Sequence, residues 1–207
     1  MKEYSKIETI YDRDEKTHKV IVGKWRMPEF AYLANCEWVF TEKVNGTNVR
    51  IGWNGGDIEF GGKTDDSQIS SLLVKKLTET FRPLTQTLQE KFGEAAVTFY
   101  GEGYGAKIQK EGKNYTPDAV DFVLFDVLVG IWWLERHNVE DVAQALGLRV
   151  VPIVGRGTLE DATVFCREGF SSTWGNFPAE GVVLRPAVEL QTRGGERIIG
   201  KLKHRDF

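Results

Sequence analysis

The residues "WVFTEKVNGTNVRIGWNGGDIEFGG", positions 38 to 62, decide the fold class of this chain. Apolar and polar side chains alternate through "WVFTEK", "NVRIGW" and "DIEFGG", and this two-residue period is typical of half-buried β-strands. The turn residues Asn54, Gly55 and Gly56 separate the last two runs and predict a hairpin. We therefore expect antiparallel strands across this stretch.

Helices are expected between further groups of strands. Apolar residues three or four positions apart predict a helix over residues 68–91, interrupted or kinked at Pro83. A shorter helix is expected from a cap at Asn138 to a stop at Gly147, and another from Thr158 to Gly169.

The later strands are predicted at "AVTFYGEGYG", which runs into a glycine-rich loop, and at "DFVLFDVLV", "GVVLRP" and "RIIGKLK". The strands cluster in hairpins without a regular βαβ alternation. This order favours an α+β fold of mostly antiparallel sheets flanked by helices over a doubly wound fold.

Composition limits the classes of function. The 207 residues suit one domain, and 27 Lys and Arg against 30 Asp and Glu give a net charge of -3. A polyanionic partner would therefore be held by a local cluster of cations.

The two cysteines, Cys36 and Cys166, are far apart and lack metal-ligand spacing, which indicates a protein of a reducing compartment. The charged opening residues are no signal peptide, and the longest apolar stretch is too short to span a bilayer. We expect a soluble, cytoplasmic protein without a membrane partner.

Charged residues at the ends of predicted strands are the candidates for chemistry. Lys43 follows an apolar run, Glu102 and Glu180 lie beside glycines, and Lys201 and Lys203 alternate, so that both point to one face of a strand. Each alone is explained as a surface group. Together they could form a nucleotidyl-transfer site, with one lysine as nucleophile, two lysines on phosphate and two carboxylates on a metal.

Five motifs support this interpretation. "EKVNGTN" resembles motif I (Lys-x-x-Gly) of the covalent nucleotidyltransferases, and the chain is most similar to the phage RNA ligase 2 class, which includes the kinetoplastid editing ligases. "YGEGYGAKIQKEGKNY" resembles motif III and the segment after it, "DFVLFDVLV" motif IIIa, "AEGVVLRP" motif IV and "RIIGKLK" motif V. The resemblance implies the nucleotidyltransferase (ATP-grasp-like ligase) fold. It also implies a single adenylyltransferase domain over residues 1–207, without an appended OB-fold or C-terminal domain.

The resemblance implies catalytic roles for Lys43, Lys201 and Lys203. Lys43 would attack the α-phosphorus of ATP, giving lysyl-AMP and pyrophosphate, while the other two lysines would hold the α-phosphate. A free lysine has a pKa near 10.4, so forming its neutral, nucleophilic amine near neutral pH costs roughly 4 kcal/mol. Neighbouring cations would lower that pKa and would also stabilise charge in the transition state.

ATP contacts are implied at further positions. Glu42 would contact adenine and Phe125 would stack on it, while Asn48 and Glu102 would hold the ribose. Arg185 follows motif IV, where the class also carries a cation. Lys63 stands where the class usually has arginine, and it keeps the charge but loses the planar fork.

A metal site for Mg²⁺, or alternatively Mn²⁺, is implied at Glu102, Glu180 and Asn45. Mg²⁺ keeps much of its water shell, so part of this contact would run through water. Many family members have aspartate at the position of Asn45, and an amide orients a metal-bound water without adding charge.

The resemblance implies an ATP-dependent RNA ligase that joins RNA 5′-phosphate and 3′-hydroxyl ends, preferably in a nicked duplex. A partner protein could supply a missing domain. The cations near the motifs that could hold nucleic acid are Arg50, Lys63, Lys107, Lys110, Arg185 and Arg205. The alternatives are a DNA ligase or capping-type nucleotidyltransferase core, and a non-catalytic module that binds nucleotide or nucleic acid.

Overall fold

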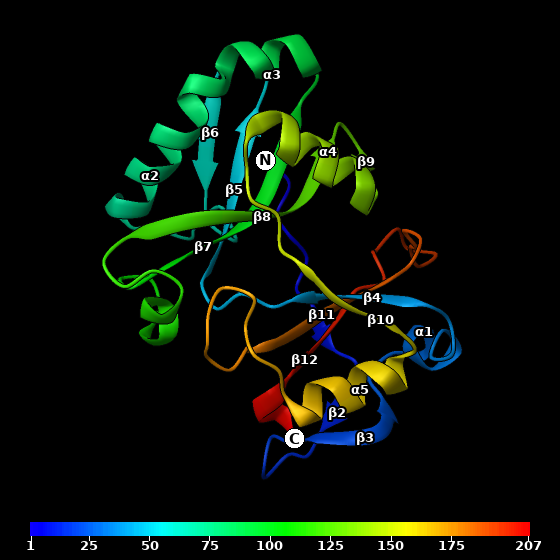
Figure 1. Ribbon diagram of the computed structural model, residues 1–207. Helices are drawn as coiled ribbons and strands as arrows, with labels where there is room; N and C mark the ends of the chain where they lie inside the picture. Colours follow the sequence, from blue (N-terminus) through cyan, green and yellow to red (C-terminus); the bar gives the residue numbers. More distant parts are fainter. The chain divides into compact units, whose positions relative to one another are not determined.

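The computed structural model describes residues 1–207, which divide between two units, each built around its own sheet (Figure 1). Unit 1 contains Met1–Ser5 and Asn45–Val151, and unit 2 contains Lys6–Val44 and Pro152–Phe207. Both sheets are mainly antiparallel and carry helices, which confirms the α+β class predicted from the alternating strands. The boundary follows Val44, so Lys43 and Asn45 belong to different units.

The sheet of unit 1 has five antiparallel strands in the order β6-β5-β7-β8-β9. Their bounds are Thr47–Trp53 for β5, Ile58–Gly61 for β6, Val97–Gly105 for β7, Val120–Val129 for β8 and Trp132–Trp133 for β9. The helical segments are α2 (Ser71–Phe81), η1 (Arg82–Leu84), α3 (Thr85–Phe92), η2 (Lys110–Asn114) and α4 (Arg136–Leu146).

One face of this sheet packs against α2, α3 and α4 to form the core of unit 1. Val49, Ile51 and Trp53 of β5 are buried in the same cluster as Leu73 and Leu77 of α2. Every second residue of β5 therefore faces the helices, as the sequence period predicts. The alternate residues of β5, Asn48 among them, face the opposite side of the sheet.

Most local predictions in unit 1 are confirmed. The hairpin β5–β6 pairs Trp53 with Ile58, although "WVFTEK" joins the sheet of unit 2 instead. The helix over residues 68–91 is interrupted by η1, which contains Pro83. The predicted cap at Asn138 is wrong, because the N-cap of α4 is Glu135, three residues earlier. Its predicted end at Gly147 is confirmed by a left-handed φ of 64°.

The glycine-rich loop predicted after "AVTFY" is not a loop. Strand β7 continues to Gly105 and pairs with both β5 and β8 over the glycines. Glycine is disfavoured in strands, but the neighbours approach closely: a Cβ on Gly101 would overlap the Phe122 ring. Tertiary packing therefore outweighs the low strand propensity of these glycines.

The main sheet of unit 2 has the order β1-β12-β11-β4-β10, and a hairpin of β2 and β3 forms a second, small sheet. The strands are β1 (Glu8–Thr9), β2 (Tyr11–Arg13), β3 (Val20–Trp25), β4 (Trp38–Glu42), β10 (Ile153–Gly157), β11 (Gly181–Pro186) and β12 (Gly200–Lys203). The helical segments are α1 (Pro28–Tyr32), α5 (Leu159–Glu168) and η3 (His204–Asp206).

The core of unit 2 lies between the main sheet and α5. Phe40, Val182, Leu184 and Leu202 of the sheet are buried in one cluster with Leu159 and other residues of α5. Helix α5 begins as predicted at Thr158, which forms a reciprocal capping box with Asp161, and its C-cap is Gly169. Because β4, β11 and β12 place these core residues on one face, the alternate residues lie on the other face.

None of the helices has the length and apolar character needed to cross a lipid bilayer.

Candidate active site

A glutamate bridges two lysines on the face of the unit 2 sheet that α5 does not cover. Lys43 Nζ lies 2.7 Å from Glu180 Oε2, and Lys203 Nζ lies 2.6 Å from Glu180 Oε1. All three side chains are largely buried, with 22, 13 and 17% of Lys43, Glu180 and Lys203 exposed. The predicted nucleophile, a predicted phosphate-binding lysine and a predicted metal ligand are thus in direct contact.

Strand pairing produces this contact. The amide of Lys43 donates to the Gly181 carbonyl at 2.9 Å, and the amide of His204 donates to the Glu180 carbonyl at 3.0 Å. The end of β4 and the end of β12 therefore hold the start of β11 between them. Gly181 is required there, since a Cβ at this position would overlap the Leu202 carbonyl oxygen.

Lys201 lies on the same face as Lys203, as the alternation along β12 predicts. It pairs with Val183 of β11, while Lys203 pairs with Gly181. Lys201 is half-buried and forms no hydrogen bond or ion pair. Burial, and then repulsion by Lys203 and Lys43, hold the pKa of Lys201 below its ordinary value, against the opposite pull of Glu8.

Glu180 is ionised at neutral pH. Burial alone would raise the pKa of its carboxyl, but the attraction of Lys43 and the hydrogen bonds from Lys203 and Lys43 outweigh this effect and lower the pKa. An ionised carboxylate is a hard oxygen donor suited to Mg²⁺ or Mn²⁺.

Glu42 lies on the opposite side of β4 from Lys43. It is 1% exposed, and its carboxylate accepts hydrogen bonds from Ser172 Oγ at 2.6 Å, Thr173 N at 2.9 Å and Thr173 Oγ1 at 2.8 Å. These bonds fix the loop that follows α5. The role of Glu42 toward adenine stays a prediction.

Arg185 lies near the end of β11, opposite Val39 of β4. It is on the same face as Val183 and hence as Lys201. It is partly buried. Its role toward ATP also stays a prediction.

In unit 1, Asn48 and Glu102 are directly opposite each other on β5 and β7. Both side chains lie on the face away from α2. Val49, next to Asn48, and Phe99, three residues before Glu102, point into the core, and alternate residues of a strand face opposite sides. The Oδ1 atom of Asn48 is buried and has no hydrogen-bond partner. A buried acceptor without a donor is unfavourable, so this atom suits a hydroxyl group of a ligand.

Phe125 lies on this same face, and a bulge in β8 keeps the next residue, Asp126, on that face as well. Tyr100 pairs with Asp126 while Gly101 pairs with Leu124, which leaves Phe125 as the extra residue. Without the extra residue, strict alternation would turn Asp126 toward the helices. The Phe125 ring meets Tyr4 edge-on, with 5.1 Å between ring centroids.

Asn45 and Gly46 form the turn at the start of unit 1. The Asn45 amide N–H donates to the Tyr115 hydroxyl at 3.1 Å, and its side-chain Nδ2 donates to Glu111 at 3.3 Å. A Cβ on Gly46 would overlap the Gly103 carbonyl oxygen of β7. The glycine of "KVNG" is therefore required by close packing against β7. The metal role of Asn45 stays a prediction.

The nucleic-acid role predicted for Arg50 is wrong. Arg50 is 1% exposed, and its guanidinium donates to the Gly62 carbonyl at 2.6 Å, the Met1 carbonyl at 3.0 Å and Asp65 at 2.8 Å. Its planar fork holds the chain end and the β6–α2 loop together. Lys63, in that loop, is exposed, as are Lys107 and Lys110.

Comparison with known proteins identifies the family. The model of the RNA ligase family matches residues 36–203, a range that contains every predicted catalytic, ATP-binding and metal-binding residue. The chain belongs to the RNA ligase family.

Solved RNA ligases from Naegleria gruberi share the fold of this RNA ligase family member. The structure with pyrophosphate has a TM-score of 0.65 at 17% identity, and the match covers 96% of this chain and 56% of that chain. An apo structure of a lysine-to-alanine mutant has a TM-score of 0.66 at 16% identity, covering 98% and 58%. Another lysine-to-alanine mutant, solved with ATP and Mn, has a TM-score of 0.64 at 17% identity, covering 87% and 54%. The chain thus spans about half the length of these ligases.

The RNA ligase family motifs divide between the units. Unit 2 supplies Lys43, Glu180, Lys201 and Lys203, and unit 1 supplies a second set, namely Asn45, Asn48, Lys63, Glu102 and Phe125. The described residues contain no group of three or more His, Cys, Asp or Glu that could hold a metal ion. The metal roles of Glu180 and Glu102 stay predictions.

Sequence reasoning missed Tyr4, which belongs to this RNA ligase chain's unit 1 although it precedes β1. Its hydroxyl donates to Asp126 at 2.7 Å, and its ring packs on both Tyr100 and Phe125. The available signal was an aromatic residue in an otherwise charged opening segment. Its packing supports the Phe125 ring on the face that carries Glu102.

Proposed function

We propose that the chain is the adenylyltransferase core of an ATP-dependent RNA ligase that works through a lysyl-AMP intermediate. The observation that carries the proposal is the bridge from Lys43 through Glu180 to Lys203, with Lys201 on the same face. Family membership and structures of the Naegleria ligase with ATP and Mn support it. The proposed role is RNA repair.

The bridge defines the resting state of the nucleophile. Lys43 paired with Glu180 is an ammonium ion, which has no lone pair for attack on phosphorus. It must lose a proton and separate from Glu180 before it reacts. A bound Mg²⁺ or Mn²⁺ would supply positive charge to the phosphate oxygens, with Glu180 and Glu102 as its protein ligands.

Two ammonium groups remain to receive the phosphate. Lys201 has no counter-ion, and Lys203 becomes available when Glu180 turns to another cation. Both charges would stabilise the negative charge that increases on the α-phosphate in the transition state. The Lys43 nitrogen forms a bond to the α-phosphorus as the bond to the bridging oxygen breaks, and pyrophosphate leaves with that electron pair.

The nucleotide contacts of unit 1 complete the proposal. The unpartnered Oδ1 of Asn48 would accept a hydrogen bond from a ribose hydroxyl, and Phe125 would stack on the base. In the later steps AMP passes to an RNA 5′-phosphate and a 3′-hydroxyl displaces it. A nicked duplex would align these ends, and a separate protein could supply further contacts.

Incubation with α-labelled ATP and Mg²⁺, followed by a denaturing gel, tests the covalent step. The adduct should be stable to base and labile to acid, as a phosphoramidate is, and GTP should label poorly. The informative variant is Lys43→Arg, which keeps a cation opposite Glu180 but lacks a nucleophilic amine. Lys16→Arg, in an exposed turn, is the matched control. Labelling of Lys43→Arg at the level of this control would refute the proposal.

A further inference from the structure

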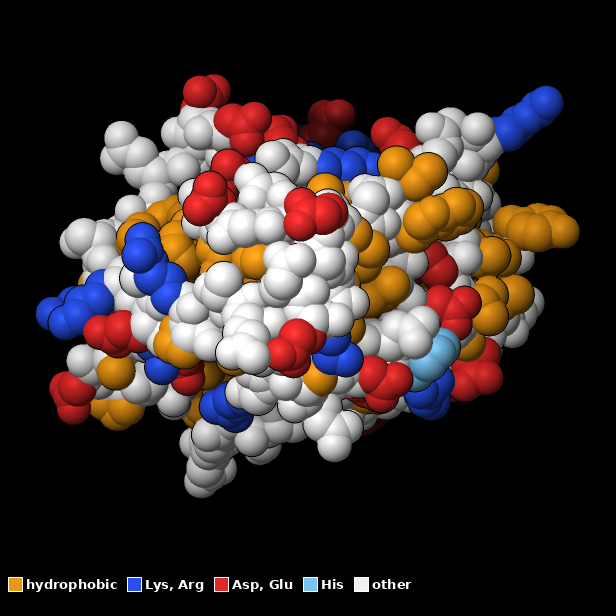
Figure 2. All heavy atoms as spheres, turned by 90° about the horizontal axis from the view of Figure 1, so that it is seen from above, with side chains coloured by type: hydrophobic (Ala, Val, Ile, Leu, Met, Phe, Trp, Pro, Cys, Tyr) orange, Lys and Arg blue, Asp and Glu red, His pale blue; other side chains and the backbone are white.

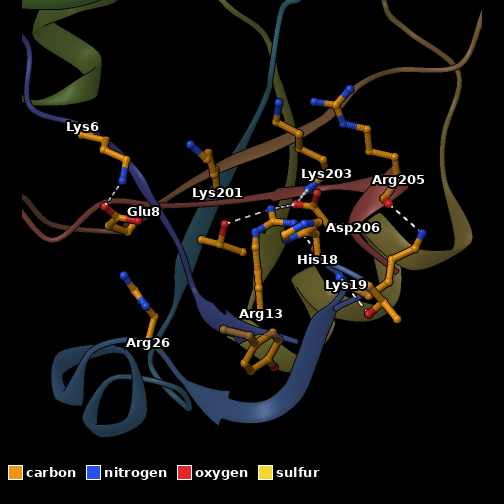
Figure 3. Close-up of a pocket in the computed structure, with 13 residues that line it drawn as sticks. Lys6, Glu8, Arg13, His18, Lys19, Arg26, Lys201, Lys203, Arg205 and Asp206 are labelled. Carbon is orange, nitrogen blue, oxygen red and sulfur yellow. Dashed lines mark hydrogen bonds and ion pairs between the residues drawn. The ribbon is translucent and has the colours of Figure 1, made fainter. Parts of the chain in front are cut away.

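A cationic pocket lies on unit 2 beside the lysine pair of β12 (Figure 3). Its volume is about 610 Å³, and its walls come from β1, the β2–β3 hairpin, β12 and η3. Lys201 and Lys203 line it, whereas Lys43 and Glu180 do not. The two lysines therefore face both the nucleophile's cluster and this pocket.

The pocket concentrates positive charge that the chain as a whole lacks. Seven Lys or Arg residues line it against two carboxylates, in a protein whose net charge is -3. Both carboxylates are already paired: Glu8 with Lys6 at 2.7 Å, and Asp206 with Arg13 at 2.7 Å. The face of the molecule in Figure 2 differs, because there acidic and basic side chains are interspersed. The pocket is thus a local concentration of positive charge.

Several of these cations lack a counter-ion. Lys201 is half-buried and forms no ion pair, and the guanidinium of Arg205 likewise has no partner. Arg26 shares the single carboxylate of Asp12 with Lys24, at 3.2 and 3.3 Å. The half-buried charge of Lys201 in particular is unfavourable without an anion.

The cations are spread along the pocket. In Figure 3, Lys6 and Arg26 lie at one end, Lys19 and Arg205 at the other, and Lys201 lies between the two ends. This spacing suits a row of phosphate groups better than one compact anion, because a compact anion would contact only one part of the row.

The hairpin that forms one wall is held in a defined shape. The Asp14 side chain accepts from the amides of Lys16 and Thr17, and His18 is the one non-glycine residue with positive φ, at 58°. Lys19 donates to the Arg205 carbonyl at 2.9 Å, which ties the hairpin to η3. The pocket is therefore built before any ligand binds, so little ordering entropy opposes binding.

We propose that this pocket binds the phosphodiester backbone of an RNA strand and leads its 5′-phosphate to Lys201 and Lys203. The inference rests on the proposed function, since it places the acceptor of AMP beside the lysines that hold AMP. Residues 6–26 and 204–206, which form most of the walls, lie outside the range matched by the family model. Most of this surface is therefore formed by segments that flank the matched range.

The test measures binding of a 5′-phosphorylated single-stranded RNA without ATP and with EDTA, so that no catalysis is involved. The pocket variant is Arg26→Gln with Arg205→Gln, two exposed residues outside the lysine cluster. The matched control is Arg82→Gln with Arg193→Gln, which removes the same charge from exposed sites elsewhere. Affinity is measured by fluorescence anisotropy over a series of salt concentrations.

The pocket variant should bind RNA several-fold more weakly than the control. Its slope of log affinity against log salt should be shallower by roughly 1.4, about 0.7 for each lost contact to a single strand. In parallel, calorimetry with inorganic pyrophosphate should show the same affinity for both variants.

Equal RNA affinities and salt slopes in the two variants would overturn the proposal. Loss of pyrophosphate binding in the pocket variant, with RNA binding intact, would overturn it in favour of a leaving-group site. Because neither measurement requires adenylylation, failure here is distinct from failure of the covalent mechanism, which the labelling experiment reports.

Discussion

Replacing Glu180 by glutamine tests whether the lysine bridge holds the end of the unit 2 sheet together. At N–O distances of 2.7 and 2.6 Å and an effective dielectric of about 20, each lysine attracts the carboxylate by roughly 6 kcal/mol. Loss of solvation offsets most of this attraction. Removing one member of a buried pair nevertheless costs about 3–5 kcal/mol, because the remaining charge is left unpaired. Partial exposure places the expected loss for Glu180→Gln near the lower limit, about 3 kcal/mol.

Urea unfolding followed by circular dichroism measures this loss at pH 7. Glu79→Gln is the matched control, since Glu79 forms an exposed pair with Lys75 at 3.9 Å and should cost at most about 0.5 kcal/mol. Adding Lys203→Met to Glu180→Gln should restore part of the stability, because one unpaired ammonium is removed. If Glu180→Gln costs no more than Glu79→Gln, the bridge does not stabilise the fold and the reasoning is refuted.

The same variant has a defined pH dependence. The folded-state pKa of Glu180 is lowered from 4.5, so its contribution to stability is fully present above that value. It is lost as the pH falls through the lowered pKa. The difference in unfolding free energy between the parent protein and Glu180→Gln should therefore shrink in acid. A difference that is constant down to strongly acidic pH would contradict the assignment.

Three further results are expected. Phe125→Ala should raise KM for ATP in self-adenylylation by the equivalent of about 1–3 kcal/mol of lost stacking. Lys203→Ala should mainly lower kcat. Kinetics with the reverse pattern would mean that the face of β8 or of β12 is misassigned. Cys36 should react with a thiol reagent at pH 8, whereas Cys166 should react only after unfolding. Burial, and then the charge of Asp206, raise the pKa of the Cys166 thiol to about 12. Mass spectrometry that shows two modified thiols in the native protein would contradict this. Gly46→Ala should destabilise the protein in thermal unfolding, because the added methyl overlaps β7, and an unchanged midpoint would show that the turn can shift.

Much of the fold follows from local patterns in the sequence. The alternation in "NVRIGW" and "DIEFGG" predicts the β5–β6 hairpin, and Pro83 marks the break between α2 and α3. The capping pair Thr158 and Asp161 defines the start of α5. These features depend on residues close together in the chain, so a single sequence contains the information.

The missed features depend on long-range contacts. Strand β7 passes through its glycines because Gly101 packs on Phe122, which is distant in sequence. The cap predicted at Asn138 is wrong because α4 begins behind Glu135, without a side-chain capping bond. The burial of Arg50 follows from its bonds to Met1 and Asp65, which no local pattern indicates.

The sequence motifs predicted which residues belong to the candidate site, but they did not predict its geometry. The motif resemblance groups Lys43, Glu180 and Lys203, and the structure adds that both lysines share one carboxylate. The bulge that turns Asp126 to the same face as Phe125 has no sequence signal apart from an aspartate in an apolar run. The cationic pocket was also missed, because its residues come from both ends of the chain and become neighbours only through pairing of β1 with β12.

Intact-protein mass spectrometry after incubation with ATP and Mg²⁺ tests the central claim most directly, with peptide mapping of the product. The account predicts a mass increase of one AMP residue per chain, located on the peptide that contains Lys43 and absent in Lys43→Arg. The account is contradicted if the folded protein gains no mass, or if the AMP maps to a lysine other than Lys43.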